Sequence, residues 1–196
     1  MDIKANVKSI TQLKDYFFLV PDYQREYVWK PDDQVEQFLI DIDNEYEPSI
    51  QQQKAYFIGS IIIVENNGKY DVIDGQQRLT TIILSLCAFR DLMRELSLDQ
   101  NQKNYLTGID TLLSSFDMNT GETRLRLELQ YEESKDFLTD LITDKPYNEE
   151  VTPSIQKMQL AYAKLKSHFE SYSKESVDSL INFARYFLTK IELVVI

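Results

Sequence analysis

The chain alternates between stretches with apolar residues at helical spacing and shorter runs rich in β-branched and aromatic residues. The first helical pattern follows Pro31, with Asp32 or Asp33 as its N-cap and an acidic opposite face. A longer helical pattern runs from about Gln77 to Leu96. The apolar positions that define these two helices are Val35, Phe38, Leu39, Ile42 and Tyr46 in the first, and Leu79, Ile82, Ile83, Leu86, Met93 and Leu96 in the second.

Two strand-like runs, residues 56–64 and 69–73, separate these helices. They are joined through a segment that contains Asn67-Gly68, and Asn-Gly between β-rich runs indicates a hairpin because both residues tolerate positive φ. The second run ends at Asp74-Gly75, directly before the long helix. The pattern therefore predicts an antiparallel strand pair followed by a tight glycine turn and a helix.

The second half of the chain is mainly helical in pattern. We expect helices over residues 101–118 and 131–143, with a half-buried strand over residues 124–129 between them. Two further helices, from Pro153 and from about Val177, should form an antiparallel hairpin. The apolar segment 192–196 looks like the opening of a buried strand, so we expect the chain to be part of a longer protein.

These elements predict an α+β fold with a small mixed sheet. Residues 1–98 should form an α/β core with the hairpin and the strand-turn-helix unit, and residues 99–196 a mainly helical extension, truncated at its C-terminal end. A hydrophobic fraction of 43% is that of a globular protein rather than a disordered one. The single cysteine, Cys87, lies in an apolar run and is expected to be a buried structural thiol.

Charge and hydropathy exclude some classes of function. A net charge of −11 argues against a surface that coats nucleic acid, because Lys and Arg supply most non-specific affinity, so any nucleic-acid contact must be local. No stretch approaches the roughly 20 apolar residues of a membrane helix, and the N-terminus lacks the layout of a signal peptide. We expect a cytoplasmic protein with no membrane partner.

The strongest candidate for chemistry is the segment 74–81, Asp-Gly-Gln-Gln-Arg-Leu-Thr-Thr, at the junction of strand and helix. A helix N-terminus favours an anion, Gly75 lets the backbone approach closely, and Arg78 adds a bidentate donor, so the segment is typical of a phosphate cradle. Gln76 and Gln77 supply amides, Thr80 or Thr81 could reach an anion or a metal-bound water, and Asp74 could orient Arg78 or help hold Mg²⁺. A local structural turn is an equal alternative, with Asp74 capping the helix, Gln77 bonded locally and Arg78 paired with an acidic neighbour.

A second candidate is the segment 20–29, which contains Tyr23, Gln24, Arg25, Tyr27 and the single tryptophan, Trp29. Aromatic rings beside an arginine suit the binding of a base or nucleotide. Packing is the preferred explanation for the tryptophan, since it could plug the core before the acidic helix, so Arg25 is the better functional candidate.

Other signals are weak. His168 has no Cys, His or paired carboxylate at ligand spacing, which argues against a metal site or a Ser/His hydrolase. The run 41–45 lacks the glycine and terminal glutamate of an EF-hand loop and is better explained as a solvated helix face. The phosphate-loop and Gly-x-Gly-x-x-Gly patterns do not occur. Any use of nucleotide must follow another route.

The order and spacing of these motifs resemble a known family. Pro-x-Tyr-Gln-Arg-x-Tyr-x-Trp at residues 21–29, Phe-Ile-Gly-Ser at 57–60 and Asp-Gly-Gln-Gln-Arg-Leu-Thr-Thr at 74–81 are similar to the N-terminal domain family of the GmrSD type IV restriction enzymes, with the DGQQR motif. The resemblance is strongest over residues 10–90 and extends through Ile196. It implies a core related to the ParB and sulfiredoxin fold, in which a Gly-x-x-Arg turn binds nucleotide phosphates.

The resemblance also implies a function. In this bacterial phage-defence family the domain is associated with binding or hydrolysis of an NTP with Mg²⁺, which drives or regulates cleavage of modified DNA. The partners implied are a nucleotide, DNA reached through the full-length protein, and a downstream His-Asn-His nuclease domain in the same or a partner chain. One histidine cannot form such a nuclease centre, so none is expected within these residues.

Roles carried over from the family fall on both motifs. Gly75 and Arg78 would contact phosphates, Gln76 and Gln77 would position nucleotide or water, and Asp74 would be the metal-organising or catalytic carboxylate. The predicted catalytic residues are therefore Asp74, Gln77 and Arg78. Tyr23, Gln24 and Arg25 would close the same pocket from the other side. Two other classes stay open at this point, a non-catalytic DNA-binding or specificity module and a metal-dependent nuclease that uses Asp74, and so does a homo-oligomer.

Overall fold

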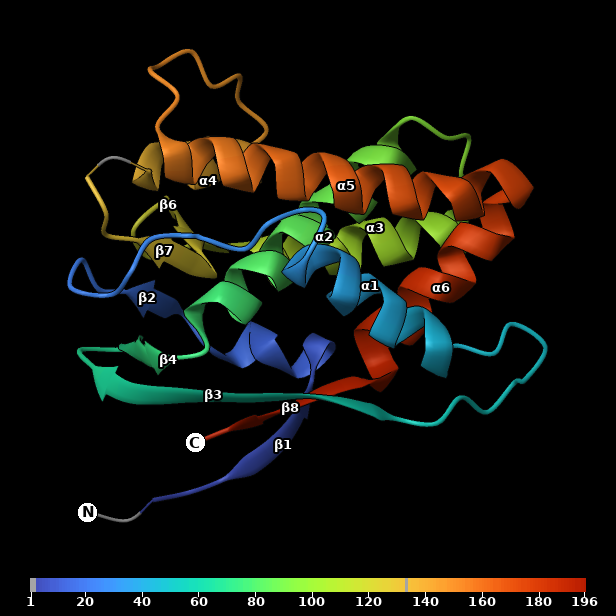
Figure 1. Ribbon diagram of the computed structural model, residues 1–196, viewed down its shortest axis with the longest axis horizontal. Coiled ribbons are helices and arrows are strands. Elements are labelled where there is room, and N and C mark those ends of the chain that lie inside the picture. Colours follow the sequence, from blue (N-terminus) through green and yellow to red (C-terminus); the bar gives the residue numbers. More distant parts are fainter. Residues whose placement is uncertain (1–2, 133) are drawn as a thin grey trace.

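A computed structural model describes residues 3–132 and 134–196. It confirms a mixed α+β fold, in which helices cover one face of a sheet (Figure 1). The sheet has the order β1-β8-β3-β4-β2-β7, and a separate two-stranded ribbon pairs β5 with β6. The strands of the sheet are β1 (Asn6–Ser9), β2 (Phe18–Val20), β3 (Tyr56–Asn66), β4 (Lys69–Asp74), β7 (Leu127–Leu129) and β8 (Ile191–Val195).

The elements predicted after Pro31 in the first half of the chain are present, and the structure adds β1, η1 (Ile10–Asp15) and β2 before them. The 3-10 helix η1 follows β1, and α1 (Gln34–Glu45) starts after Asp33. β3 and β4 form the predicted antiparallel hairpin, with Asn67 and Gly68 both at positive φ in its turn. The turn at Gly75 then leads into α2 (Gln76–Arg94).

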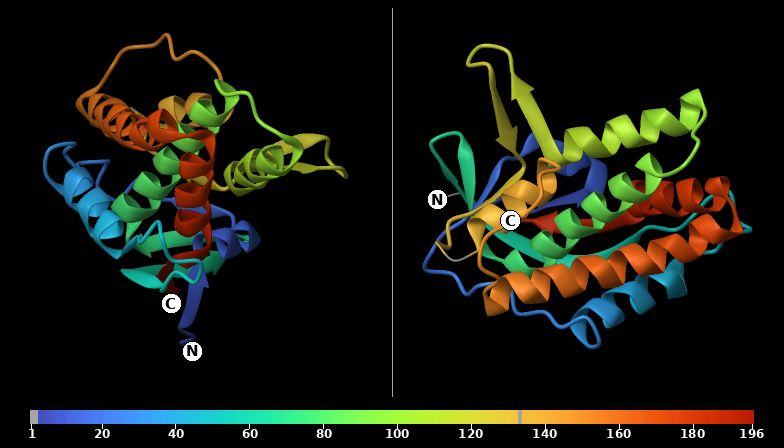
Figure 2. Two further views of the ribbon diagram at one scale, coloured as in Figure 1. Left: turned by 90° about the vertical axis from the view of Figure 1, so that its right-hand side faces the viewer. Right: turned by 90° about the horizontal axis from the view of Figure 1, so that it is seen from above.

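Helix α2 is the centre of the hydrophobic core. Figures 1 and 2 show it between the sheet below and α5 (Pro153–Glu175) above, flanked by α1, α3 (Gln100–Leu113) and α6 (Val177–Lys190). Residues on every side of it are buried, from Gln76 through Met93, which explains why its sequence is apolar over more than one face. Cys87 is fully buried and free, as predicted.

Two predicted elements in the second half are wrong in their extent. The helix over residues 101–118 ends at Leu113, because residues 114–117 form β5 and pair with β6 (Glu122–Leu125) across a turn with Gly121 at positive φ. The single strand over residues 124–129 is divided at Arg126 into β6 and β7, which belong to different sheets. At this break the Arg126 amide donates to Leu113 O and its side chain is turned inward to Thr111 O. Tertiary contacts thus overrode the local pattern.

The remaining helices agree better with the pattern. The helix expected over residues 131–143 is shorter, since α4 (Lys135–Ile142) begins only after Ser134; residue 133 lies outside the described part of the chain. The predicted pair of C-terminal helices is present, joined through Ser176, which caps α6 through a hydrogen bond from Ser179 N. Residues 191–195 form the predicted buried strand, β8, between β1 and β3.

The sheet unites the two regions proposed from the sequence. β8 pairs with β1 and β3, and β7 pairs with β2, so strands from residues 99–196 extend a sheet begun by residues 6–74. The boundary at residue 98 stays a prediction, as does the relation to the ParB fold; residues 1 and 2 lie outside the described range. No helix within residues 3–132 and 134–196 has the length and apolar character needed to cross a membrane.

Candidate functional site

The turn between β4 and α2 requires glycine. Gly75 has φ +87°, and a Cβ built on it would lie 2.7 Å from Cγ2 of Ile61 and 2.9 Å from Ser60 O. The turn therefore packs directly against the neighbouring strand β3, and it holds the N-terminus of α2 beside the middle of that strand. Asp74 does not cap the helix, because Gly75 is the N-cap and no side chain bonds to it.

Arg78 leaves the first turn of α2 and reaches across β3. Its Nη1 donates to Ser60 O at 2.9 Å, and its guanidinium lies over Gly59, where a Cβ would be only 2.7 Å from Cζ. The register of β3 against β8 shifts between Phe57 and Ser60, so this strand is irregular where the arginine crosses it. No carboxylate among the described residues forms an ion pair with Arg78. Most of its N–H donors are therefore free for a ligand.

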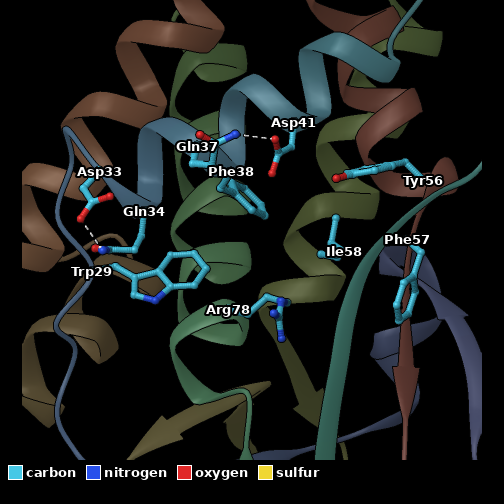
Figure 3. Close-up of a pocket in the computed structure, with 10 residues that line it drawn as sticks. All are labelled: Trp29, Asp33, Gln34, Gln37, Phe38, Asp41, Tyr56, Phe57, Ile58 and Arg78. Atoms are coloured by element: carbon cyan, nitrogen blue, oxygen red, sulfur yellow. Dashed lines mark hydrogen bonds between the residues drawn. The ribbon is translucent and has the colours of Figure 1, made fainter.

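A pocket of about 340 Å³ opens beside this guanidinium, between α1 and the first half of β3. Figure 3 shows Arg78 and Trp29 on its lower side and polar residues of α1 along its upper wall. The lining combines one cation, four aromatic rings and two carboxylates: Trp29, Asp33, Gln34, Gln37, Phe38, Asp41, Tyr56, Phe57, Ile58 and Arg78. This is the mixture of stacking surface and charged groups that suits a polar aromatic ligand.

The amide of Gln77 joins the two sequence motifs. Its Oε1 accepts from Val28 N at 2.8 Å and its Nε2 donates to Glu26 O at 2.9 Å. One turn later the buried hydroxyl of Thr81 lies 2.9 Å from the hydroxyl of Tyr27. These contacts clamp the segment that precedes α1 onto the start of α2, and so hold Trp29 at the edge of the pocket.

The Tyr-Gln-Arg part of the first motif is divided by the structure. Gln24 lies against the glycine turn, where its Nε2 donates to Ile73 O at 3.0 Å and its Oε1 accepts from Gln76 at 3.4 Å. Tyr23 is 70% exposed and Arg25 is exposed as well, and neither lines the pocket. The two motifs are therefore brought together through Gln24 and residues 26–28, rather than through the side chains of Tyr23 and Arg25.

The side chains predicted to react or to bind phosphate differ in whether their polar atoms are exposed or already hydrogen-bonded. Both ends of the Gln77 amide are occupied by backbone groups, and Thr81 also donates to Gln77 O, while Thr80 is buried. Asp74 is exposed. Among residues 3–132 and 134–196 no three His, Cys, Asp or Glu side chains gather in a group that could hold a metal ion. The catalytic roles of Asp74, Gln77 and Arg78 stay predictions, and only Arg78 lines the pocket.

Sequence reasoning missed the wall that α1 supplies. Gln34, Gln37 and Asp41 lie on the polar face of this helix and line the pocket, together with Tyr56 at the start of β3. Their spacing of three and four residues places them on one face, which was the available signal. His168, by contrast, contacts Asp43 at 3.0 Å in a packed aromatic region. Its predicted lack of a metal role stays a prediction.

Comparison with known proteins places the chain in a family. The sequence profile described as "GmrSD restriction endonuclease, N-terminal domain" matches residues 6–196. No curated protein matches the chain. Because the match covers nearly the whole sequence, including the glycine turn, Arg78 and every strand of the sheet, the chain belongs to the GmrSD restriction endonuclease family, as its N-terminal domain.

Proposed function

We propose that this domain binds a nucleoside triphosphate in the Arg78 pocket, and that binding or hydrolysis regulates DNA cleavage by the restriction enzyme to which the domain belongs. One observation carries the proposal. A guanidinium that has no carboxylate partner among the described residues stands at a helix N-terminus, inside a pocket lined by aromatic rings. An arginine so placed in a chain of net charge −11 is available to an anionic ligand.

The phosphate end of the ligand is matched by Arg78 and the start of α2. The first N–H groups of a helix lack intrahelical acceptors and carry a partial positive charge, so they add to the arginine in binding an anion. The close packing at Gly59 and Gly75 keeps both groups beside the same stretch of β3. Gln76 lies at this turn with its amide held by Gln24, so it would position the phosphates rather than react with them.

The aromatic side chains match the rest of a nucleotide. Trp29 packs on Phe38 at a centroid distance of 6.3 Å and still contributes to the pocket surface, as do Tyr56 and Phe57. Stacking of a base on such rings is worth about 1–3 kcal/mol. A pocket of about 340 Å³ falls within the range of small-molecule sites.

A triphosphate would bring Mg²⁺, which neutralises phosphate charge. Asp74, exposed at the residue before Gly75, is the carboxylate that the sequence places at this turn, and we propose it as a contact for the nucleotide-bound ion. The described residues contain no cluster of candidate metal ligands, so nothing in them supports a nuclease centre. Contact with DNA is assigned to the full-length protein, because the net charge of −11 disfavours extensive DNA contact here.

Titration calorimetry of the chain with ATP, GTP, CTP and UTP in the presence of Mg²⁺ tests the proposal. We expect at least one nucleotide to bind, and Arg78→Ala to weaken its affinity by about tenfold or more, since hydrogen bonds to charged groups contribute about 1.5–3 kcal/mol. Arg78→Lys keeps the charge but not the planar, two-pronged donor of arginine, so its nucleotide affinity should lie between those of the wild type and Arg78→Ala.

Arg94→Ala is the matched control, because Arg94 lies at the other end of the same helix, in ion pairs with Asp110 and Asp144. It should leave nucleotide affinity unchanged. Thermal unfolding of each variant separates loss of binding from loss of fold. Failure of every nucleotide to bind, or equal affinity in the wild type and a folded Arg78→Ala variant, contradicts the proposal.

A further inference from the structure

The wall of the pocket opposite Arg78 carries carboxylates that are held in place by neighbouring amides. Gln37 Nε2 donates to Asp41 Oδ1 at 2.6 Å, and the amide of Gln34 donates to Asp33 (Figure 3). Gln34, Gln37 and Asp41 come from one face of α1 and Asp33 directly precedes the helix; all four line the same pocket as the arginine. A site built only for phosphate would not contain them, because they repel an anion.

The two carboxylates of the pocket lie at opposite ends of its α1 wall. From Gln34 to Asp41 the helix rises by about 10 Å, at about 1.5 Å per residue. Figure 3 shows Asp41 at the same end of the pocket as Tyr56, whereas Trp29 lies near Asp33 at the other end. Asp33 and Asp41 both repel phosphates, which would therefore stay at the Arg78 guanidinium, and the Asp41 end is left for the uncharged part of a ligand.

The Asp41 end offers a defined set of hydrogen-bonding atoms. The amide of Gln37 occupies Oδ1 of Asp41, so Oδ2 is open as an acceptor. The hydroxyl of Tyr56 makes no hydrogen bond with the described residues, and burial together with Asp41 and Glu45 raises its pKa, so it stays protonated and can donate. A carboxylate oxygen beside a hydroxyl donor matches a group that presents its own N–H or O–H next to an acceptor.

We propose that Asp41, oriented by Gln37, binds a hydrogen-bond donor on the nucleoside part of the ligand and thereby determines which nucleotide the pocket accepts. This inference rests on the proposed function. The donor is either an N–H group on the edge of the base or a hydroxyl of the ribose, and a carboxylate accepts from both. Asp41 is then a specificity-determining residue, and Gln37 is a positioning residue that fixes its carboxylate.

The experiment compares ratios of affinities rather than single affinities. Dissociation constants of the four ribonucleoside triphosphates and their 2′-deoxy forms, all with Mg²⁺, are measured for the wild type and for Asp41→Asn. Asparagine keeps the size of the side chain but presents an N–H donor, so it should weaken or reverse the preference for nucleotides that donate a hydrogen bond to Asp41. We expect at least one ratio, between two bases or between a ribo and a deoxy form, to change by about three- to tenfold.

Two further variants make the result specific. Gln37→Leu should change the same ratio in the same direction but less, because it leaves the carboxylate in place without its orienting amide. Glu36→Gln is the matched control on α1: Glu36 pairs with Lys164 and does not line the pocket, so all ratios should stay at their wild-type values.

The outcomes separate this inference from the proposed function. A change in the base ratios supports contact with the base, and a change confined to the ribo-to-deoxy ratio supports contact with the ribose. Loss of affinity by one common factor for all nucleotides, or no change at all, overturns the specificity role of Asp41 while nucleotide binding stands. If the wild type binds no nucleotide, the proposed function itself is overturned.

Discussion

The two ends of helix α2 use the same side chain in opposite ways. Near the N-terminus, Arg78 is half-buried, makes one backbone hydrogen bond and leaves its other donors in a pocket. In the C-terminal half, Arg90 is 1% exposed, and all three of its nitrogen atoms donate to protein acceptors. The arginine with spare donors is therefore the one suited to a ligand, and the saturated arginine is part of the fold.

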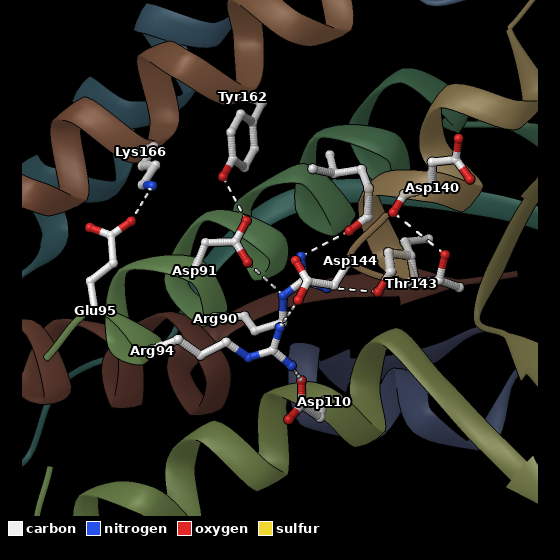
Figure 4. Close-up of polar contacts among 12 residues, drawn as sticks. Arg90, Asp91, Arg94, Glu95, Asp110, Asp140, Thr143, Asp144, Tyr162 and Lys166 are labelled. Atoms are coloured by element: carbon white, nitrogen blue, oxygen red, sulfur yellow. Dashed lines mark hydrogen bonds and ion pairs between the residues drawn. The ribbon is translucent and has the colours of Figure 1, made fainter. Parts of the chain in front are cut away.

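The contacts of Arg90 explain why it can be buried. Nη1 and Nη2 donate to Ile142 O and Leu141 O at 2.7 and 2.8 Å, and Nε donates to Asp91 at 2.7 Å (Figure 4). The guanidinium thus caps the C-terminus of α4, where free carbonyl groups favour a cation. Asp91 in turn accepts from the hydroxyl of Tyr162 on α5 at 2.6 Å, so one cluster ties α2 to two other helices.

This comparison divides α2 into a binding end and an anchoring end. The anchoring end is fixed by its polar cluster and by stacking of Phe89 on Phe169 of α5, at a centroid distance of 3.9 Å. The binding end is fixed by the clamp of Gln77 and by the glycine turn. Because one continuous helix joins them, rigidity at the anchoring end helps to keep Arg78 in place.

The largest expected effect is the loss of stability on substitution of Arg90. Arg90→Ala leaves Asp91 and the last carbonyls of α4 without their cation, and removal of one partner from a buried ion pair costs about 3–5 kcal/mol. Arg78→Ala should lower the free energy of unfolding by only about 1 kcal/mol, the value of a single hydrogen bond. Urea denaturation of both variants measures the difference.

Arg90→Lys serves if the alanine variant does not fold, since it keeps the charge but cannot reach three acceptors with a planar fork. It should still be less stable than Arg78→Lys. Equal losses of stability at the two positions would show that the division into binding and anchoring ends is wrong.

Whether the sequence predicts a feature of these two ends depends on how far apart in the sequence the contacting residues lie. The glycine turn and the hairpin were predictable because Asp74-Gly75 and Asn67-Gly68 carry local φ requirements. The clamp of Gln77 was not, since its acceptor and donor lie about fifty residues away at Glu26 and Val28 and nothing local gives the direction of an amide. The same holds for Arg90, which is followed by an acid and resembles an ordinary surface pair.

The division of the segment 124–129 has a similar origin. Its alternating pattern is that of one strand, and only tertiary contacts reveal the break. Arg124 and Arg126 both place their guanidinium groups over the ring of Phe17, at 3.9 and 4.4 Å from its centroid. At the break itself Arg126 N donates to Leu113 O and its Nε to Thr111 O, and an alternating pattern does not predict either contact.

An intermediate effect is expected when Gly59 is given a side chain. Gly59→Ala would place Cβ 2.7 Å from Cζ of Arg78, so the guanidinium must move and nucleotide affinity should fall. Gly68→Ala is the matched control: its φ is also positive, at +78°, but nothing lies within 4 Å of the new Cβ. Alanine at Gly68 carries a backbone strain of about 1–2 kcal/mol, and alanine at Gly59 is strained further, because its φ of +116° lies outside the left-handed helical region.

Calorimetry and urea denaturation together resolve the two contributions. Gly59→Ala should lose more stability than Gly68→Ala, because it also displaces the Arg78 hydrogen bond worth about 1 kcal/mol, and only Gly59→Ala should lose nucleotide affinity. If Gly68→Ala weakens binding as much, the effect comes from general destabilisation of the β3–β4 hairpin, and the close approach of Arg78 to the strand is not what organises the binding end.

The smallest effect is expected for Arg78→Ala on the reactivity of Cys87, which lies in α2 one turn before Arg90. Burial raises the pKa of this thiol to about 12, so in the native state almost no thiolate forms at pH 8 and a thiol reagent should label it only when the helix opens. The rate of labelling then follows the population of the open state. In the wild type and in Arg78→Ala the rates should be slow and within a few-fold of each other, because a loss of about 1 kcal/mol changes that population only by such a factor.

In Arg90→Ala the same rate should rise by about a hundredfold or more, in line with the expected loss of stability. The pH dependence gives an independent check. The thiol ionises near pH 8.5 when unfolded and near 12 when folded, so its contribution to stability is complete below about pH 8.5 and is lost as pH rises toward 12. Cys87→Ala should remove the part of the loss of stability at alkaline pH that comes from ionisation of this thiol. Rapid labelling of wild-type Cys87 at pH 8 would mean that the anchoring end opens readily, and the contrast between the two arginines would then not be one of rigidity.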